Sequence, residues 1–343
     1  MPVRRLSYLY LVPVLTLSSS IVVADLRADS HAPTGVMFEH LHKQGAVMVG
    51  YHVEQIQQKG DLLRGSHTLL ASDSPAASYA MLPTDHTMTM QMLDVMYAPS
   101  NNLTLMLMPM VMNMEMGMAE NNFYVPAVGA HTGHSHASGH EVSGIGDTTL
   151  AALYRLHHDS QQELIATLAV IAPTGQDDIM GTDGKPVHYG MQLGAGIWQA
   201  MPSLTYRYKH NAYVVGTQIL TRQPLQQRNE LNVRVPDLNQ ATIWLSYAWR
   251  DELSTSLRVQ YRNEDVYEGH YNVSHNHSAP ADKQGNYGGE QTLVGAGINW
   301  VMPTGTLKGL RLGVEYLAPV AESVNGVQLV TKRQWQMSIS KAY

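Results

Sequence analysis

Apolar and polar residues alternate along most of the chain, in stretches of about 10 to 14 residues that end at turn-forming residues. In the stretch 253–262, for example, Leu253, Leu257 and Val259 share one face, whereas Arg258 and Arg262 share the other. A period of two is typical of β-strands with two different faces. We expect twelve such strands: 46–57, 86–98, 103–117, 146–157, 162–173, 196–209, 212–222, 239–250, 253–264, 291–302, 309–318 and 329–342.

The connections between these strands alternate in length. Short turns are expected at 99–102, 159–162, 210–212, 251–252 and 303–309, and long loops at 58–85, 118–145, 174–195, 223–238 and 265–290. An even number of antiparallel strands, with short turns at one end and long loops at the other, is typical of outer-membrane barrels. Strands of ~10–12 tilted residues also match the thickness of a bilayer. The pattern predicts an all-β, antiparallel transmembrane β-barrel of about 12 strands, with short periplasmic turns and long extracellular loops.

The first residues have the features of an export signal. Arg4 and Arg5 precede an apolar stretch at 6–17, and Val22 and Ala24 supply the small residues of a cleavage site. We expect a signal peptide at 1–24, a periplasmic N-terminal segment at 25–45 and a barrel at 46–343, placed in the bacterial outer membrane. A further possibility is that residues 25–44 enter the lumen and close it.

Composition excludes several classes of protein. The chain has 343 residues, no cysteine and a formal net charge of −6. Without cysteine it is neither a disulfide scaffold nor an N-terminally lipidated lipoprotein. Its weakly acidic balance gives no reason to expect nucleic acid as a partner. The expected partners are outer-membrane lipid and lipopolysaccharide, together with a small solute or metal ion, and the expected state is a monomer.

The stretch LTLMLMPMVMNMEMGM (103–118) has a methionine at every even position from Met106 to Met118. The preceding strand has methionines on its even face together with Asp94. A carboxylate that faces lipid is unfavourable, so this even face is predicted to line the lumen. A three-residue turn at 100–102 would place Met96 opposite Met106, and it would also align the pairs Met92–Met110 and Met90–Met112.

Together with other polar residues on lumen-facing positions, these methionines form the predicted solute path. Its members are Met48, His52, Glu54, Met88, Met90, Met92, Asp94, Met96, Met106, Met108, Met110, Met112, Met114, Arg258, Arg262, Arg311 and Glu315. Thioethers suit soft ions such as Cu(I) and Ag(I), which makes copper our preferred cargo. The alternative is that flexible methionines pack the lumen and contact hydrophobic or aromatic solutes.

The chain has 17 histidines, and many of them gather in the predicted loops. Imidazole is a common metal ligand, although no segment has the HExxH spacing of zinc enzymes. The candidate metal ligands are His40 and His42 on the periplasmic side, and His131, His134, His136, His140, His270, His275 and His277 on the outer side. No resident cofactor is predicted beyond such a soft metal ion.

An enzymatic barrel is the less favoured alternative. The stretches HNHSAP and HSHASGH bring histidine and serine close together, as a lipid hydrolase would require. Both stretches lie in polar, glycine-containing loops, and neither has a positioned acid or amide. We therefore expect a protein without catalytic residues.

Several stretches together resemble a known family. MFEHLHKQGAVMVGYH, MTMQMLDVMYAPSNNLTLMLMPM, GIGDTTLAALYRL, IAPTG and GAGIWQAMPSLTY are similar to the outer-membrane transporters grouped with the MetA-pathway of phenol degradation family. The methionine-rich part is most similar to a branch associated with copper and heavy-metal resistance. The resemblance implies a barrel of the 12-stranded type that performs passive or facilitated transport and has no assigned catalytic residue. It leaves the choice between a metal ion and an aromatic solute open.

Overall fold

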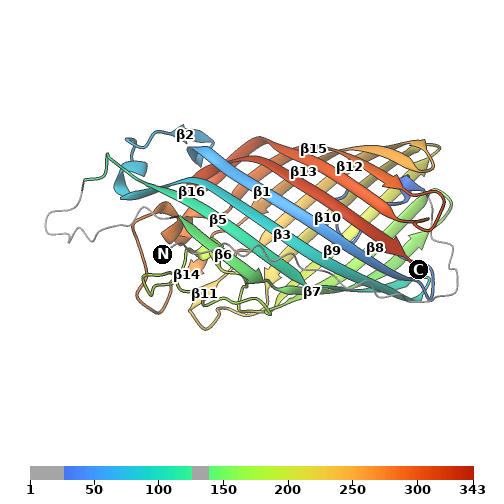
Figure 1. The fold of residues 1–343 in the computed structure, drawn as a ribbon, viewed down its shortest axis with the longest axis horizontal. Coiled ribbons are helices and arrows are strands. Elements are labelled where there is room, and N and C mark those ends of the chain that lie inside the picture. The colour runs from blue at the N-terminus through green and yellow to red at the C-terminus, as the bar shows by residue number, and fades with distance from the viewer. Residues whose placement is uncertain (1–26, 126–138) are drawn as a thin grey trace.

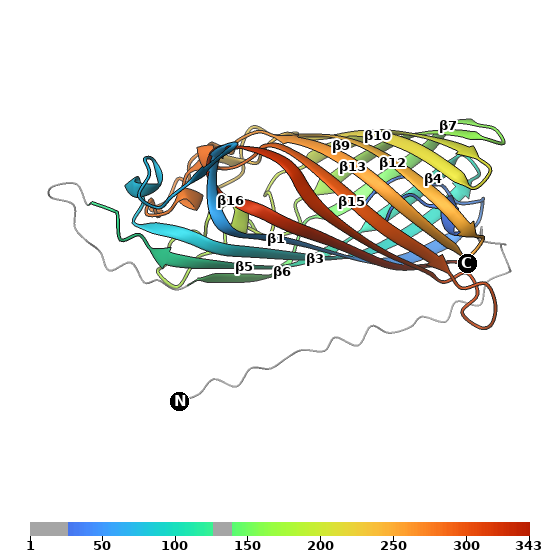
Figure 2. The same cartoon turned by 90° about the horizontal axis from the view of Figure 1, so that it is seen from above.

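The computed structural model describes residues 27–125 and 139–343. The predicted signal peptide and the candidate ligands His131, His134 and His136 lie outside these residues. Long, tilted strands wrap around a common axis (Figure 1). Figure 2 shows the same strands from above, with the long connections gathered at one end and the C-terminus at the other.

Antiparallel pairing closes the sheet into a barrel, because β1 pairs with both β3 and β16. Within the described residues the barrel wall has twelve strand positions, here called staves. Each stave is one strand, two short strands in line, or one arm of β16. The staves are β1 (Val47–Gly65), β3 (Met81–Ser100), β4 (Leu103–Met108) with β5 (Met110–Glu120), β6 (His140–Ile145) with β7 (Thr148–His158), β8 (Gln162–Ala172), β9 (Gln199–His210), β10 (Tyr213–Pro224), β12 (Leu238–Arg250), β13 (Leu253–Glu264), β15 (Gly289–Val301) and the two arms of β16 (Arg311–Ala342). The predicted fold class is confirmed.

Local chemistry explains two irregular staves. Pro109 has no backbone N–H and separates β4 from β5, but its carbonyl still accepts a hydrogen bond from Leu93 N at 3.1 Å, so the stave continues. In β16, residues 311–324 pair with β15 and residues 324–342 pair with β1. The strand folds back at Gly326, whose φ of 61° suits glycine.

Some predicted boundaries were wrong. We expected a loop at 58–85, but β1 runs to Gly65 and β3 begins at Met81. The two strands pair with each other as far as Lys59 and Asp85, and beyond that point β1 pairs with β16 and β3 pairs with β5. The turn after β3 also differs from the expected three-residue loop. Ser100 pairs with Leu103, and an irregularity between Tyr97 and Ser100 restores the register.

The short connections lie at the end of the barrel that holds the C-terminus, where Tyr343 and Val47 exchange backbone hydrogen bonds (Figure 1). The long loops lie at the opposite end. They contain β2 (His67–Leu69), β11 (Val233–Arg234), β14 (Glu268–Gly269) and the 3₁₀ turns η2 (Ala76–Ser78), η3 (Tyr189–Met191), η4 (Pro280–Asp282) and η5 (Gln284–Asn286). The predicted sorting of loops by length holds for this fold.

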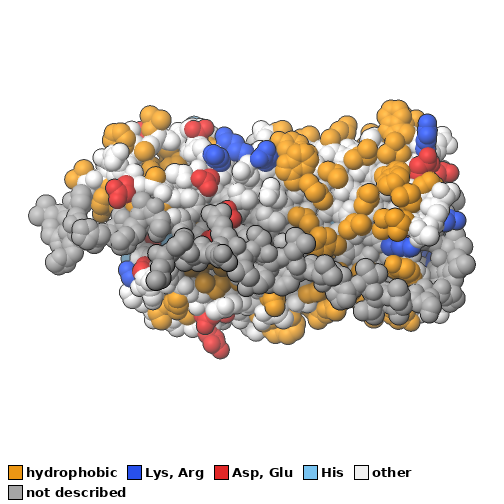
Figure 3. Space-filling view, in the orientation of Figure 1, with side chains coloured by type: hydrophobic (Ala, Val, Ile, Leu, Met, Phe, Trp, Pro, Cys, Tyr) orange, Lys and Arg blue, Asp and Glu red, His pale blue; other side chains and the backbone are white. Residues whose placement is uncertain are grey.

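The outer surface of the staves is apolar. Leu105, Leu107, Val215, Leu257 and Val259 are among many large apolar side chains that are exposed there. On the visible face they form a broad area over the half of the barrel nearer the C-terminus (Figure 3). Such a large exposed apolar surface is typical of a barrel that contacts lipid.

The helical turns of the described residues are short. In this part of the chain, none has the length and hydropathy of a membrane-spanning helix.

Candidate functional site: the lumen and the segment within it

The residues from Arg27 to Ala46 are here called the N-terminal segment, and most of them lie inside the barrel, whereas Lys43, Gln44 and Gly45 are exposed. The segment begins with η1 (Ala28–Ser30), and Ala28, Ala32 and Phe38 are buried. Residues 25–45 were assigned to the periplasm from sequence, with entry into the lumen left open. Residues 28–42 of the segment occupy the lumen.

One side of the lumen, here called the polar wall, consists of the inward faces of β9, β10, β12, β13, β15 and β16. Its buried side chains are mainly hydroxyls, amides and charged groups: Thr205, Gln218, Thr242, Ser246, Ser254, Ser256, Arg258, Gln260, Glu315, Gln334, Gln336 and Ser340. Alternation along each strand places these residues inside and the apolar residues outside.

The polar wall binds the backbone of the N-terminal segment. Gly35 N donates to Glu315 Oε2 at 2.9 Å, and Gln218 Nε2 donates to Met37 O at 2.7 Å. Asn299 Nδ2 donates to Ala32 O at 3.3 Å. These bonds come from three different staves, so the segment is fixed to this side of the lumen along much of its length.

A close approach at Gly35 depends on glycine. A Cβ atom built there would lie 1.4 Å from Gln336 Oε1 and 2.6 Å from Arg258 Nη2. Beside it, Arg258 Nε and Glu315 Oε1 form an ion pair of 2.8 Å in which both side chains are fully buried. Any larger residue at position 35 must displace the segment or these partners.

The opposite side of the lumen, here called the methionine wall, consists of the inward faces of β1, β3, β4 and β5. Pairing aligns its side chains in rows across the strands. From the short-turn end, the rows are Met48–Met96–Met106, His52–Met92–Met110, Glu54–Met90–Met112, Ile56–Met88–Met114 and Gln58–His86–Met116. The predicted cross-strand register is confirmed.

The methionine wall contacts the N-terminal segment through apolar side chains. Phe38 belongs to one buried cluster with Met48, Met92, Met96, Met106 and Met108. Met37 and Leu41 pack against the same cluster. The segment is thus hydrogen-bonded to one wall and packed by dispersion against the other.

Two internal cavities follow the methionine wall. The larger, of about 560 Å³, is lined by Met88, Met90, Met110, Met112 and Met116. The smaller, of about 100 Å³, is lined by Met48, Met92, Met96, Met106 and Met108. Four residues line both cavities and mark the boundary between them: Gly35, Met37, Glu54 and Gln336.

Met114 differs from the other predicted path methionines. It is fully buried in a cluster with Val142, Val187, Met191 and Leu193 and lines neither cavity. The loop that follows β8 covers it, so its visible role is packing. It provides a natural control for the methionines that do line the cavities.

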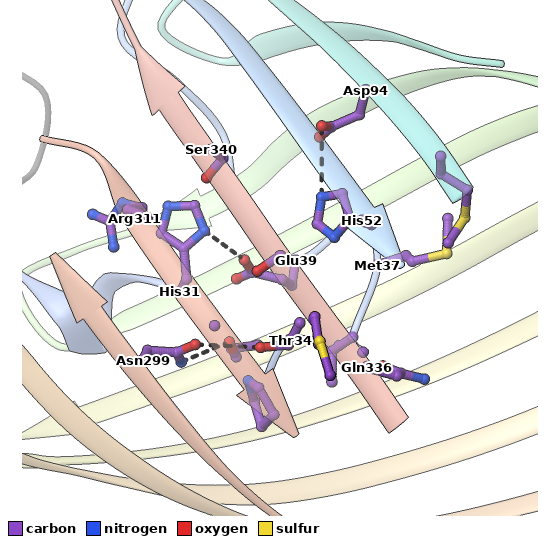
Figure 4. Close-up of a pocket in the computed structure, with 18 of the residues that line it drawn as sticks. His31, Thr34, Met37, Glu39, His52, Asp94, Asn299, Arg311, Gln336 and Ser340 are labelled. Atoms are coloured by element: carbon purple, nitrogen blue, oxygen red, sulfur yellow. Dashed lines mark hydrogen bonds and ion pairs between the residues drawn. The ribbon is translucent and has the colours of Figure 1, made fainter. Parts of the chain in front are cut away.

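The smaller cavity also contains a cluster of histidines and a carboxylate from the N-terminal segment (Figure 4). Glu39 Oε1 lies 3.2 Å from His31 Nδ1 and 2.7 Å from His40 Nδ1. His42 Nε2 lies 3.2 Å from His40 Nε2, and Arg207 Nη1 lies 3.1 Å from the other Glu39 oxygen.

Burial sets the protonation of this cluster. Desolvation lowers the pKa of His42 to about 3, with a further contribution from the charge of His40, and it lowers the pKa of His31 well below its ordinary value. Burial alone would raise the pKa of Glu39, but the adjacent rings of His40 and His31 hold it well below its ordinary value. At neutral pH the cluster therefore contains a carboxylate beside neutral His31 and His42.

The remaining predicted charges of the lumen are paired. His52 Nε2 lies 3.5 Å from Asp94 Oδ1, as the dashed line in Figure 4 shows, and Glu54 accepts a hydrogen bond from Gln334. Arg262 contacts Glu264 at 2.8 Å, and Glu264 also contacts Arg222 at 2.9 Å.

Arg311 points into the smaller cavity near His31 (Figure 4). Its guanidinium donates to Arg27 O at 3.0 Å and to Ser30 Oγ at 2.7 Å. This predicted path residue therefore also anchors the start of the N-terminal segment.

Among the described residues, the predicted outer histidines His140, His270, His275 and His277 do not form one group. His140 lies near the long-loop end of the methionine wall, where it pairs with Met116 in the sheet. His275 and His277 face each other, with ring centroids 4.4 Å apart. His270 Nδ1 lies 3.0 Å from Gln284 Nε2.

Sequence reasoning missed several residues near these sites. His188 has its ring centroid 4.8 Å from that of His140, and its Nδ1 lies 2.7 Å from Asp282 Oδ1. His31 and Glu39 were missed at the other end, although both occur with His40 and His42 in the stretch HAPTGVMFEHLH. That density of ligand-type residues was an available signal.

Comparison with solved structures supports the fold. The structure is similar to the COG4313 outer membrane channel from Pseudomonas putida F1, with a TM-score of 0.61 and 14% sequence identity over 91% of this chain and 100% of that chain. The transport unit of the autotransporter AIDA-I from Escherichia coli has a TM-score of 0.45 at 11% identity, covering 90% of this chain and 93% of that chain. A Pseudomonas aeruginosa FadL homologue has a TM-score of 0.41 at 9% identity, covering 92% and 96%.

No family model matches the chain, and no curated protein matches it. At the identities above, similarity to solved structures concerns the fold alone. The barrel expected from the sequence resemblance is therefore supported, whereas the MetA-pathway family and its copper-associated branch stay predictions. The chain has the fold of an outer-membrane channel barrel.

Proposed function

We propose that this protein is an outer-membrane channel that passes a soft metal ion, Cu(I) or Ag(I), along the methionine wall. The observation that carries the proposal is the unbroken series of thioethers that lines the larger cavity and then the smaller one. The apolar outer surface of the staves supports placement in a membrane.

The chemistry of thioethers fits transfer of such an ion. Methionine sulfur is a soft, neutral ligand that protons do not compete for at ordinary pH, and soft ligands select Cu(I). Successive rows such as Met90–Met112 and Met92–Met110 would allow the ion to exchange one pair of sulfurs for the next. A wall of leucines would fill the same space without offering ligands.

The attachment of the N-terminal segment suggests where the ion passes. Its backbone hydrogen bonds run to the polar wall, whereas Met37, Phe38 and Leu41 contact the methionine wall by packing. A small displacement of these side chains costs dispersion contacts but leaves no hydrogen-bonding group unpaired. The ion would therefore move between the segment and the methionine wall, with Met37 at the boundary between the cavities.

A second candidate is uptake of hydrophobic or aromatic small molecules, with methionine as lumen packing. Four tyrosines lie around the larger cavity and favour this candidate: Tyr189, Tyr267, Tyr271 and Tyr287. The rings of Tyr189 and Tyr271 stack with centroids 4.3 Å apart, which offers an aromatic surface to a flat solute.

A flux experiment separates the two candidates. Wild-type protein and the variant Met88→Leu/Met90→Leu/Met110→Leu/Met112→Leu are reconstituted in liposomes that contain a silver-sensitive dye. Leucine conserves volume but removes the sulfur. Two matched controls are Met180→Leu, which changes an exposed methionine that lines neither cavity, and Met114→Leu, which changes a buried methionine away from both cavities.

We expect Ag⁺ entry in wild type and in both controls, and a loss of about tenfold or more in the quadruple variant, since each lost sulfur removes a ligand. Equal Ag⁺ entry in the quadruple variant, or no entry above protein-free liposomes, would contradict the metal path. Entry of an aromatic solute that survives in the quadruple variant would then favour the second candidate.

A further inference from the structure

The N-terminal segment holds a cluster of ligand-type atoms that is separate from the thioethers. His31, Glu39 and His40 each offer one ligand atom, and these three atoms lie within 4.8 Å of one another. Among the described residues, this group is the one that meets that spacing with histidine, cysteine, aspartate or glutamate.

The two distances from Glu39 to the histidines are close to those between ligands of one ion. Bonds of about 2.0–2.1 Å from zinc to nitrogen or oxygen place neighbouring ligand atoms roughly 3 Å apart. Glu39 Oε1 lies 3.2 Å from His31 Nδ1 and 2.7 Å from His40 Nδ1. An ion among these atoms would replace two hydrogen bonds that the carboxylate now accepts.

The surroundings hold the ligands in place. Arg207 Nη1 binds the second oxygen of Glu39 at 3.1 Å, which fixes the carboxylate. His42 Nε2 lies 3.2 Å from His40 Nε2, and such a partner on the far nitrogen orients a metal-bound imidazole. The Glu39 side chain is 5% exposed, so the negative charge is largely shielded from bulk water.

The ligand atoms face an open space. His31, Glu39 and His40 all line the cavity of about 100 Å³, which leaves room for an ion and a bound water or a further ligand. Figure 4 shows His31 and Glu39 directed toward each other in this cavity, with His52 and Asp94 on its far side. Imidazole and carboxylate are ligands that suit Zn²⁺ and Cu²⁺ more than they suit Cu(I).

We infer that His31, Glu39 and His40 form a binding site for a divalent transition-metal ion of the zinc or copper(II) type, with His42 as the positioning residue of His40. All four residues belong to one twelve-residue stretch of the N-terminal segment. A bound ion therefore ties the two ends of this stretch together and rigidifies the part of the segment that faces the methionine wall. The site is independent of which solute the barrel passes.

The test measures Zn²⁺ binding to the refolded protein by titration calorimetry. All variants are made in a background in which His131, His134, His136, His140, His188, His270, His275 and His277 are glutamine, so that the predicted outer ligands and the neighbouring His188 cannot contribute. The site variant is His31→Gln/His40→Gln. The matched control is His52→Gln, because His52 lines the same cavity but lies outside the cluster.

We expect the background protein to bind one Zn²⁺. The site variant should lose affinity about 100-fold or more because it lacks two of the ligands, whereas the affinity of the control should stay within about threefold. The variant Glu39→Gln, whose side chain has nearly the same shape but no charge, should also lose affinity for Zn²⁺. Unchanged affinity in the site variant, an equal loss in His52→Gln, or no binding by the background protein would overturn the inference.

A second measurement leaves the three proposed ligands unchanged. Electron paramagnetic resonance of Cu²⁺ bound to the background protein should show hyperfine coupling to two imidazole nitrogens. A spectrum without nitrogen coupling would overturn the inference. Because neither readout involves flux, Zn²⁺ binding in a barrel that does not pass Ag⁺ would reject the proposed transport function and retain this site.

Discussion

The polar wall and the methionine wall line one lumen but hold the N-terminal segment by different physical means. The polar wall uses hydrogen bonds and a buried ion pair, which are directional and costly to break singly. The methionine wall uses many weak dispersion contacts that tolerate a change of shape. One wall therefore fixes the segment in place, whereas the other can deform and leave a path beside it.

The largest expected effect comes from the ion pair of the polar wall. Glu315→Gln leaves the guanidinium of Arg258 buried without a countercharge and weakens the bond to Gly35 N. We expect the free energy of unfolding to fall by about 3–5 kcal/mol, as in other proteins that lose one partner of a buried pair. The midpoint of urea unfolding in detergent measures this, and Glu290→Gln, an exposed carboxylate on β15, is the control. Equal midpoints for the two variants would contradict a structural role for the pair.

The next effect concerns the close approach at position 35. Gly35→Ala brings a Cβ against Gln336 and Arg258, and overpacking of this kind costs about 1–3 kcal/mol. The segment should leave its place before the barrel unfolds. Because the chain has no cysteine, the rate at which a thiol reagent modifies Ala32→Cys, a site that is 4% exposed, reports that departure. Modification should accelerate with Gly35→Ala and stay unchanged with Gly285→Ala, where a Cβ meets open space.

Acid should release the segment progressively. His31 and His42 have pKa values below their ordinary value of 6.5, so below pH 6.5 the released segment binds protons that the docked segment does not. Docking is therefore fully stable above pH 6.5 and weakens as the pH falls toward about 3. Glu39, also with a lowered pKa, adds a loss in the same direction below its ordinary value of 4.5.

The groups that face these histidines set the size of the acid effect. Arg311 and His40 lower the pKa values of His31 and His42, whereas Glu39 raises them. Modification of Ala32→Cys between pH 7.5 and 4.5, with a reagent whose own rate is corrected for pH, measures the release. A rate that is flat over this range would contradict the assignment of neutral His31 and His42 in the docked segment.

The smallest expected effect is that of thioether replacement on stability. Each of Met92→Leu, Met96→Leu and Met106→Leu conserves volume and should change the free energy of unfolding by less than about 1.5 kcal/mol. The same urea assay measures this and provides a direct contrast with Glu315→Gln. A loss as large as that of the ion pair would show that these methionines are needed for packing and would weaken their interpretation as ligands.

Much of the barrel could be predicted because its information is local. A period of two fixes which face of a strand points inward, and the position of Asp94 among the methionines of β3 indicates which face that is. Even the register of Met96 with Met106 was predicted, although the turn that produces it differs from the expected one.

The remaining features depend on contacts that no local pattern encodes. His188 meets Asp282 across 94 residues of sequence, and both lie in loops whose path is set by packing over the mouth of the barrel. The position of the N-terminal segment depends on the cradle around Gly35, which is formed by residues more than 200 positions away. The stretch from His31 to His42 shows its density of ligand-type residues in the sequence, but the contact between His31 and Glu39 depends on how the segment folds within the lumen.

The most direct test of the central claim is to locate bound silver in crystals of the protein soaked with Ag⁺, by anomalous scattering. The account predicts peaks beside the sulfurs of the methionine wall, between the Met90–Met112 row and the Met96–Met106 row. Peaks confined to histidines, or a methionine wall without silver in crystals that bind it elsewhere, would contradict a soft-metal path through this lumen.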